Sequence, residues 1–376
     1  MNALHQDIDP NGLLEYSVVY TDRALNHMSR NFQHVMKEIS RVLKQVYRAK
    51  SAVVVPGSGT YGMEAVARQF ATGQKVLVIR NGWFSYRWTQ IFEMGNIPAS
   101  ATVLKARQVG EGGTRAPFAP APIEEVVAAI RAERPAVVFA PHVETSAGML
   151  LPPEYLRAVG AAVRDVGGLF VLDCIASGCI WVDMQDCHVD VLITAPQKGW
   201  SSTPCAGLVM LGERAREHID STTSSSYACD LRKWLSIMET YEGGGHAYHA
   251  TMPTDGLRRL LEMMEEAEVI GFDVLKTAQE TLGSKVRGLL ESKGFASVAA
   301  AGFQAPCVVV SYTDDTEIQN GKKFMAHGMQ IAAGVPLQID EPADFRSFRI
   351  GLFGLDKLQQ VDRTVASLAS ALGQLG

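Results

Sequence analysis

The chain has 376 residues, more than one typical hydrophobic core accommodates, so two domains are expected. Its hydrophobic fraction of 47%, charged fraction of 20% and net charge of −5 are those of an ordinary globular protein, and they give no reason to expect binding to nucleic acid or to a membrane surface. No apolar run reaches the roughly 18 residues of a membrane-spanning helix, and the first residues are polar and acidic rather than a signal peptide, so we expect a cytoplasmic protein.

Seven short apolar runs in the first two thirds of the chain predict β-strands. They lie at residues 52–55, 76–79, 102–105, 137–140, 169–173, 191–194 and 207–211. Most are continuous rather than alternating, as expected for strands that are covered on both faces of a sheet. The stretches 122–134 and 153–166 between them have a helical pattern. Alternating strands and helices predict an α/β fold with a mostly parallel seven-stranded sheet.

The pattern changes after about residue 250. Helices are expected at residues 257–269, 272–293, 317–329 and 355–372, and strands at residues 307–313 and 345–352. We therefore predict an N-terminal segment (1–14), a large domain (15–255) and a smaller C-terminal α/β domain (256–376). Residues 108–122, which are rich in glycine and proline, are expected to form a surface loop.

A glycine-rich turn follows the first strand. In PGSGTYGME (56–64), Gly57, Gly59 and Gly62 fit the pattern G-x-G-x-x-G before a helix. Glycines let the backbone approach a phosphate, and the start of a helix offers free N–H groups. Because Arg80 ends the next strand, an NADP dehydrogenase is one interpretation of this segment, and a structural tight turn is another. The hydroxyls of Ser58 and Thr60 suit a monophosphate instead.

An acid and an amine follow two later strands. The run 169–173 ends at Asp173, and Lys198 comes shortly after the run 191–194. Taken singly, such an aspartate is usually a cap or turn residue and such a lysine a solvated side chain. If the two strands are neighbours, about 4.8 Å apart, both groups lie at the carboxyl edge of the sheet. Pyridoxal 5′-phosphate (PLP) needs such a pair, with a carboxylate at its ring nitrogen and a lysine at its aldehyde carbon.

Cysteine spacing argues against a metal site. The six cysteines lack the paired C-x-x-C spacing of zinc sites, and their number and context do not indicate a disulfide framework. We therefore predict no bound metal.

Seven motifs lie in a fixed order along the chain. They are residues 57–64, NGWFSYRW (81–88), HVETSAG (142–148), DCIAS (173–177), PQK (196–198), YHATMP (248–253) and FRIGLFG (348–354). From about residue 50 to the end, this series resembles the class V aminotransferases of PLP fold type I, in particular the alanine–glyoxylate and serine–pyruvate aminotransferase branch.

The resemblance implies roles for individual residues. Lys198 would hold PLP as a Schiff base, and Asp173 would pair with the pyridine nitrogen. Phosphate binding is implied for Ser58, Gly59, Thr60 and Gln197. Phe84 and Ile175 would cover the two ring faces, with Thr145 near the phenolic oxygen. Tyr248 and Thr251 would reach the phosphate of the opposite subunit in a homodimer, and Arg349 would bind the substrate carboxylate. Without the resemblance, the alternation of Arg349 with apolar neighbours would equally fit a surface charge on an edge strand.

The implied reaction moves an amino group from a small α-amino acid, of the alanine or serine type, to a 2-oxo acid such as glyoxylate or pyruvate, with Lys198 as general base and acid. A PLP-dependent lyase of the cysteine desulfurase type is one alternative, although those relatives carry a histidine where this chain has Gln197. A non-catalytic PLP-binding homologue is another.

The N-terminal region departs from the family pattern. Residues Glu15 to Ser17 stand where the family has a glycine–proline loop, and Met28 and Asn31 replace its arginine and glutamate. Since that loop approaches the substrate in the family, the resemblance does not identify the amino donor.

Overall fold

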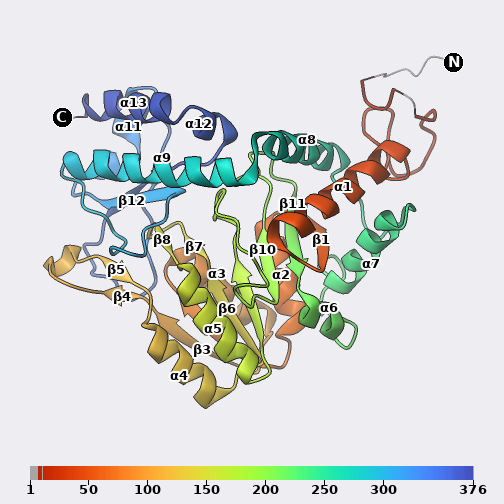
Figure 1. Ribbon diagram of the computed structural model, residues 1–376, viewed down its shortest axis with the longest axis horizontal. Coiled ribbons are helices and arrows are strands. Elements are labelled where there is room, and N and C mark those ends of the chain that lie inside the picture. Colours follow the sequence, from red (N-terminus) through yellow and green to blue (C-terminus); the bar gives the residue numbers. More distant parts are fainter. Residues whose placement is uncertain (1–6, 11, 376) are drawn as a thin grey trace.

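The computed structural model describes residues 7–10 and 12–375, and a seven-stranded sheet lies at its centre (Figure 1). The strands, in spatial order, are β1 (Ser51–Pro56), β11 (Ala206–Leu211), β10 (Val191–Thr194), β9 (Leu169–Asp173), β6 (Val137–Pro141), β2 (Lys75–Arg80) and β3 (Ser100–Lys105). The five from β10 to β3 pair in parallel, whereas β11 is antiparallel to both of its neighbours. All seven predicted strands are confirmed.

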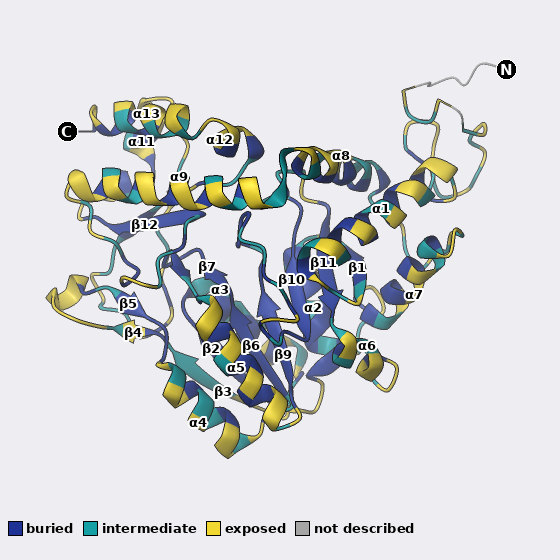
Figure 2. Ribbon diagram, viewed as in Figure 1, coloured by how far each residue is buried: buried dark blue, intermediate teal, exposed yellow. Residues whose placement is uncertain are grey.

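Helices pack around this sheet. They are α1 (Arg30–Tyr47), α2 (Gly59–Phe70), α3 (Trp83–Gly95), α4 (Ile123–Glu133), α5 (Pro153–Asp165), α6 (Glu213–Ile219), α7 (Leu231–Glu242) and α8 (Thr254–Ile270). Helix α2 contacts β10 and β11, α3 contacts β2 and β6, and α5 contacts β9. Figure 2 shows buried strands beneath helices whose outer faces are exposed, which explains the continuous apolar runs in the strands.

The C-terminal part forms a second α/β layer. Its elements are α9 (Phe272–Ser292), β12 (Val308–Tyr312), α10 (Thr316–Gln319), α11 (Lys322–Ala326), β13 (Ala332–Ala333), β14 (Ser347–Gly351), α12 (Leu355–Gln359) and α13 (Val361–Leu372). Three strands form an antiparallel sheet in the order β12-β14-β13. The long helix α9 packs against β12 on one side and against α12 and α13 on the other (Figure 1).

Two helices predicted as continuous are each interrupted. The expected helix 317–329 is divided into α10 and α11, because Gly321 adopts φ +82°, which an α-helix does not allow. The expected helix 355–372 is divided into α12 and α13 at Gln360, where φ is −132° and ψ is 52°. Both predictions were wrong because apolar side chains keep helical spacing across a break of one or two residues.

The segment 108–122 is more than the expected surface loop. It contributes to a short pair of strands, β4 (Arg107–Gln108) and β5 (Phe118–Ala119), with a 3₁₀ turn, η1 (Gly113–Arg115), between them. Phe118 is buried and donates its backbone N–H to Val298 O at 2.8 Å. The prediction was therefore wrong for the end of this segment, which docks against the C-terminal part.

The hydrophobic cores bear on the predicted domain division. Leu257, Leu260, Leu261 and Met264 of α8 pack in the core beneath the large sheet, whereas Ala267 joins the core around α9. The change of core thus falls inside α8, and the division after residue 255 stays a prediction. Within the N-terminal segment 1–14, residues 1–6 and 11 lie outside the described residues.

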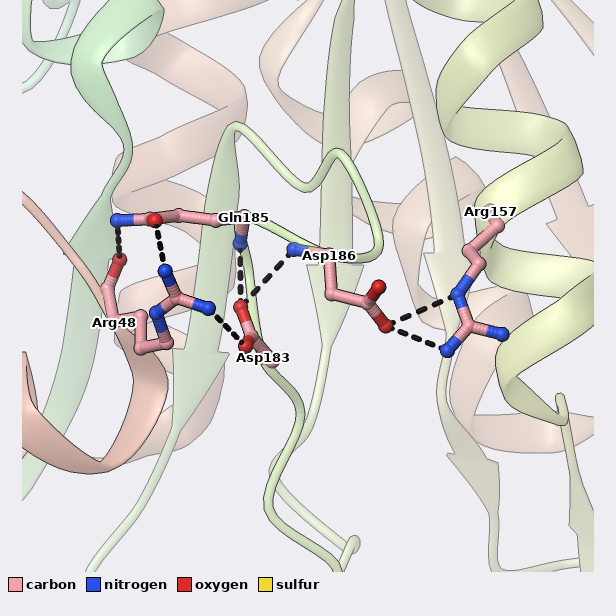
Figure 3. Close-up of polar contacts among 5 residues, drawn as sticks. All are labelled: Arg48, Arg157, Asp183, Gln185 and Asp186. Carbon is pink, nitrogen blue, oxygen red and sulfur yellow. Dashed lines mark hydrogen bonds and ion pairs between the residues drawn. The ribbon is translucent and has the colours of Figure 1, made fainter.

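Polar contacts hold the connection between β9 and β10, residues 174–190, which has no helix or strand of its own (Figure 3). Arg48, which ends α1, donates to Asp183 Oδ2 at 2.7 Å and to Gln185 Oε1 at 2.6 Å. Arg157 of α5 donates to Asp186 Oδ2 from Nε at 3.0 Å and from Nη2 at 2.7 Å. These contacts tie the segment that joins the strands of Asp173 and Lys198 to two flanking helices.

Across the described residues, none of the helices is both long enough and apolar enough to cross a bilayer.

Candidate active site

A cavity of about 220 Å³ lies at the carboxyl edge of the large sheet. Its lining comes from the turn before α2, from α2 and α3, and from the segments that follow β6, β9 and β10. The lining residues are Ser58, Gly59, Thr60, Met63, Phe84, Arg87, Val143, Thr145, Asp173, Ile175, Ala176, Gln197 and Lys198. Nine of the twelve predicted site residues are among them, and Tyr248, Thr251 and Arg349 are not.

Asp173 and Lys198 share this cavity because their strands are adjacent. Strands β9 and β10 pair in parallel, with Asp173 opposite Ile193, so the acid and the lysine loop emerge at the same edge. The structure confirms the expectation that the two strands are neighbours.

The carboxyl of Asp173 is buried and sparsely bonded. Its Oδ1 accepts the backbone N–H of Ile175 at 2.9 Å. Its pKa is raised to about 6, mainly by burial and also by the nearby charge of Glu144, while the Ile175 N–H and the positive charges of Arg87 and Lys198 act in the opposite direction. A buried carboxylate of this kind is stabilised by a cationic partner, and a protonated pyridine nitrogen is such a partner.

The amine of Lys198 faces an aromatic ring from the C-terminal part. Its Nζ lies 4.9 Å from the centroid of the Phe353 ring, a cation–π distance. Burial lowers the pKa of Lys198, and the positive charge of Arg349 lowers it further. A lysine with a lowered pKa loses its proton more readily, which imine formation and proton transfer both require.

The first turn of α2 forms another part of the cavity lining. Ser58 precedes the helix in an extended conformation, and its hydroxyl makes no capping hydrogen bond. The hydroxyl and the N–H groups of the first turn are therefore available to an anion. At Gly59, a Cβ atom would lie 2.6 Å from Ile175 Cδ1, so any side chain there would displace the residue predicted to cover the cofactor ring.

Gln197 supplies a further polar group. Its Oε1 is buried, and no donor to it is found in the part of the chain that the structure describes. An amide donates to a phosphate oxygen only from its nitrogen, so Gln197 would bind the phosphate through Nε2. With the helix N-terminus it suits the phosphate of PLP, whereas the amine and the carboxyl suit the aldehyde carbon and the ring nitrogen.

Glu144 organises the aromatic wall of the site. This fully buried carboxylate accepts the backbone N–H of Phe84 at 3.2 Å and that of Ser85 at 2.8 Å. It also accepts the hydroxyls of Ser85 and Ser146, each at 2.7 Å. A negative charge at a helix start is favourable, so Glu144 holds α3 and with it the ring of Phe84. Glu144 belongs to the motif HVETSAG (142–148), but the motif by itself predicted no role for it.

Arg349 lies beside the cavity rather than in its lining. Strand β14 is the central strand of its sheet, which contradicts the interpretation of Arg349 as a charge on an edge strand. Its Nε donates to Ala333 O at 2.8 Å, and its guanidinium carbon lies 5.6 Å from the Phe84 ring centroid. Burial lowers the pKa of Arg349, and the charge of Glu144 opposes this effect.

Tyr248 and Thr251 lie apart from this chain's own cavity. They belong to the connection between α7 and α8, both are exposed, and Tyr248 Oη lies 3.2 Å from Thr251 Oγ1. Their predicted role at the phosphate of another subunit concerns a second chain, and it stays a prediction.

Sequence reasoning missed two side chains of the site, Arg87 and Phe353. Arg87 lies three residues after Phe84, which is the spacing of one helix face, and this signal was present in the motif. Phe353 follows β14 and approaches Lys198 only through the packing of the two parts of the chain, so no local pattern pointed to it.

The strand order contradicts the dinucleotide interpretation of the glycine-rich turn. That interpretation needs the strand ending at Arg80 beside the strand before the turn. Instead β11, β10, β9 and β6 lie between β1 and β2. Arg80 donates from Nη2 to Thr89 Oγ1 at 2.9 Å, remote from the turn in the sheet order.

Comparisons with known proteins agree with this geometry, although no family model matches the chain. Alanine–glyoxylate aminotransferase 1 of Saccharomyces cerevisiae is 28% identical over 361 residues, which cover 88% of this chain and 86% of that protein. A 2-aminoethylphosphonate–pyruvate transaminase of Burkholderia ambifaria is 27% identical over 329 residues, covering 86% and 82%. The crystal structure of alanine–glyoxylate aminotransferase from Nostoc sp. superposes with a TM-score of 0.77 at 21% identity, covering 92% of this chain and 88% of the other. The chain is therefore a relative of the class V aminotransferases, and its fold is PLP fold type I.

Proposed function

We propose that this chain is a PLP-dependent aminotransferase that moves an amino group from a small α-amino acid, of the alanine or serine type, to a 2-oxo acid such as glyoxylate or pyruvate. One observation carries the proposal: Asp173 and Lys198 line one cavity together with the N-terminus of α2. The relatives named as alanine–glyoxylate and 2-aminoethylphosphonate–pyruvate aminotransferases support amino transfer to a 2-oxo acid.

Each residue of the site would have a role that follows from its position in the cavity. When bound, PLP supplies an electron-withdrawing ring that stabilises negative charge on the substrate α-carbon. Lys198 would hold the cofactor, and its amine, when free, would take and return the proton of that carbon. Asp173 would keep a positive charge at the ring nitrogen, while Arg349 would orient the substrate through a bidentate pair with its carboxylate.

The remaining contacts would fix the cofactor itself. We assign the phosphate to Ser58, Gly59, Thr60 and Gln197, the two ring faces to Phe84 and Ile175, and the phenolic oxygen to Thr145. All of these line the cavity. Because the ring would be held on both faces and at both ends, proton transfer would occur in one fixed geometry.

Two other functions are disfavoured. A lyase of the cysteine desulfurase type would have a histidine at the position of Gln197. A non-catalytic homologue would have no need of a partly buried lysine and a buried acid in the lining of one cavity. We also propose a cytoplasmic location, which fractionation of cells that express the protein would check.

The first prediction tests the function directly. When PLP-loaded protein is given one amino acid at a time without an acceptor, alanine or serine should bleach the absorbance band of the bound cofactor. Glyoxylate or pyruvate should then restore the band, with glycine or alanine as the product. If no amino acid bleaches the band, or if cysteine, in the presence of a thiol reductant, instead yields alanine and sulfide, the proposal fails.

We further propose a homodimer in which Tyr248 and Thr251 complete the phosphate site of the opposite subunit. Their exposure outside their own cavity supports this arrangement. The second prediction uses co-expressed hybrids of a Lys198→Ala chain with a Tyr248→Phe, Thr251→Val chain. Each variant alone should be nearly inactive. Each hybrid should contain one intact site, and a random mixture should recover roughly a quarter of the wild-type activity.

The control combines all three substitutions in one chain, which is mixed with wild-type chains. In that hybrid each of the two sites carries one of the defects, so it should add no active site to the mixture. Absence of recovery in the first mixture would contradict sharing across subunits, as would an active, PLP-loaded monomer in light scattering.

A further inference from the structure

Arg87 is a cation in the cavity, and among the described residues no carboxylate forms an ion pair with it. It lines the cavity from α3, and the ion pairs among the described residues include none with Arg87. Of the two carboxylates nearby, Glu144 already accepts hydrogen bonds from Phe84, Ser85 and Ser146. The charge of Arg87 acts on Asp173 and lowers its pKa, but the two form no ion pair, and Asp173 stands at the place assigned to the ring nitrogen. An anion from outside the chain is therefore the natural partner of this guanidinium.

The position of Arg87 indicates which anion. Its Nη1 donates to Thr60 Oγ1 at 3.0 Å, so the guanidinium lies at the first turn of α2. Its central carbon lies 5.3 Å from the centroid of the Phe84 ring. The side chain thus reaches from the wall assigned to the cofactor ring to the turn assigned to the phosphate, and its other N–H donors are left for a ligand.

We infer that Arg87 is a further cofactor-positioning residue, which binds the phosphate of PLP together with the first turn of α2; this inference rests on the proposed function. A phosphate monoester carries close to two negative charges at neutral pH. The helix N-terminus offers only about half a positive charge, and Ser58 and Thr60 are neutral. The planar guanidinium supplies the missing charge, and it can bond the Thr60 hydroxyl and a phosphate oxygen at the same time.

The test compares two ligands that differ only in the phosphate. Dissociation constants of PLP and of pyridoxal are measured for the apoprotein of the wild type, Arg87→Met and Arg87→Lys. In Arg87→Met the affinity for PLP should fall roughly tenfold to a hundredfold, the range for a charged hydrogen bond. Its affinity for pyridoxal should stay within about twofold of wild type. The PLP affinity of Arg87→Lys should lie between those of the wild type and Arg87→Met, because lysine keeps the positive charge but loses the planar fork of donors.

Inorganic phosphate gives a second measurement that does not need the cofactor. It should raise the melting temperature of the wild-type apoprotein, and this rise should be lost in Arg87→Met. Arg131→Met is the matched control, since Arg131 is an exposed arginine on α4 that lies 3.8 Å from Asp165. This variant should keep both affinities and the phosphate effect.

Two outcomes would overturn the inference. Equal loss of affinity for PLP and pyridoxal would mean that Arg87 only ties α3 to α2. Unchanged PLP affinity with a raised KM for substrate would assign Arg87 to the substrate instead. Wild-type protein that binds PLP but transfers no amino group would refute the proposed function and still leave the comparison of PLP with pyridoxal decisive for Arg87.

Discussion

Replacing Lys198 with alanine should lower the rate of transamination by roughly 10⁴-fold or more, because the substitution removes both the group that holds the cofactor and the proton carrier. The lining of the cavity, as far as the structure describes it, contains no second primary amine that can replace it. Burial and the charge of Arg349 lower the pKa of Lys198, so its neutral amine forms more readily than that of an exposed lysine.

Two quantities are measured on the purified variant: its turnover with alanine and glyoxylate, and its absorbance spectrum. Lys198→Arg is the informative control, since it keeps the positive charge and much of the length but holds its proton. It should be as inactive as the alanine variant. A Lys198→Ala protein that kept the cofactor band and full transamination would end the assignment of this lysine.

Replacing Asp173 with asparagine should change activity and stability in opposite directions. Without the carboxylate, the positive charge on the ring nitrogen loses its partner, and turnover should fall on the order of 10²–10³-fold, as when a preorganised electrostatic contact is removed. The cofactor should still bind, since Lys198 and the phosphate site are intact. Turnover and bound PLP are therefore measured on the same sample.

The stability of the apoprotein should rise. Burial raises the pKa of Asp173 from 3.8 in the unfolded chain to about 6 in the folded protein, so the folded state binds this proton more tightly. The contribution of Asp173 to the free energy of unfolding is therefore full below pH 4 and is lost as the pH rises towards 6. At pH 8 asparagine avoids this loss, and Asp173→Asn should be more stable by at most about 3 kcal/mol.

Urea unfolding of the apoproteins at pH 8 and at pH 4 measures this difference, which should nearly vanish at the lower pH. Asp165→Asn is the matched control, because Asp165 is an exposed aspartate at the end of α5. It should leave turnover unchanged and show no comparable gain in stability. An Asp173→Asn protein that is less stable than wild type at pH 8 would contradict the conclusion that burial makes the ionised carboxyl of Asp173 unfavourable.

The elements that were predicted well have signals in their own residues. Strands β6, β9 and β10 are runs of apolar residues buried along their whole length, and such runs stand out in a sequence. Helix α3 was not predicted. Its first residues, WFSYRW, are rich in aromatics, which have no strong helical preference, and its start depends on Glu144 from a distant segment.

The site was predicted at the positions where motifs lie next to strand ends. The turn before α2, Asp173 and Lys198 were all found in this way, and all line one cavity. Arg349 and Phe353 could not be placed beside it from the sequence, because the distance from β14 to Lys198 and Phe84 is set by how the C-terminal part packs on the large sheet.

The sequence by itself determined the strands, the glycine-rich turn and the acid and lysine that follow β9 and β10, since each depends on residues close together in the chain. Only the tertiary structure decided that four strands lie between β1 and β2, that the end of segment 108–122 is buried, and that Arg87 reaches Thr60. Strand order and side-chain contacts come from packing between distant segments, whose free energy no local pattern of residues encodes.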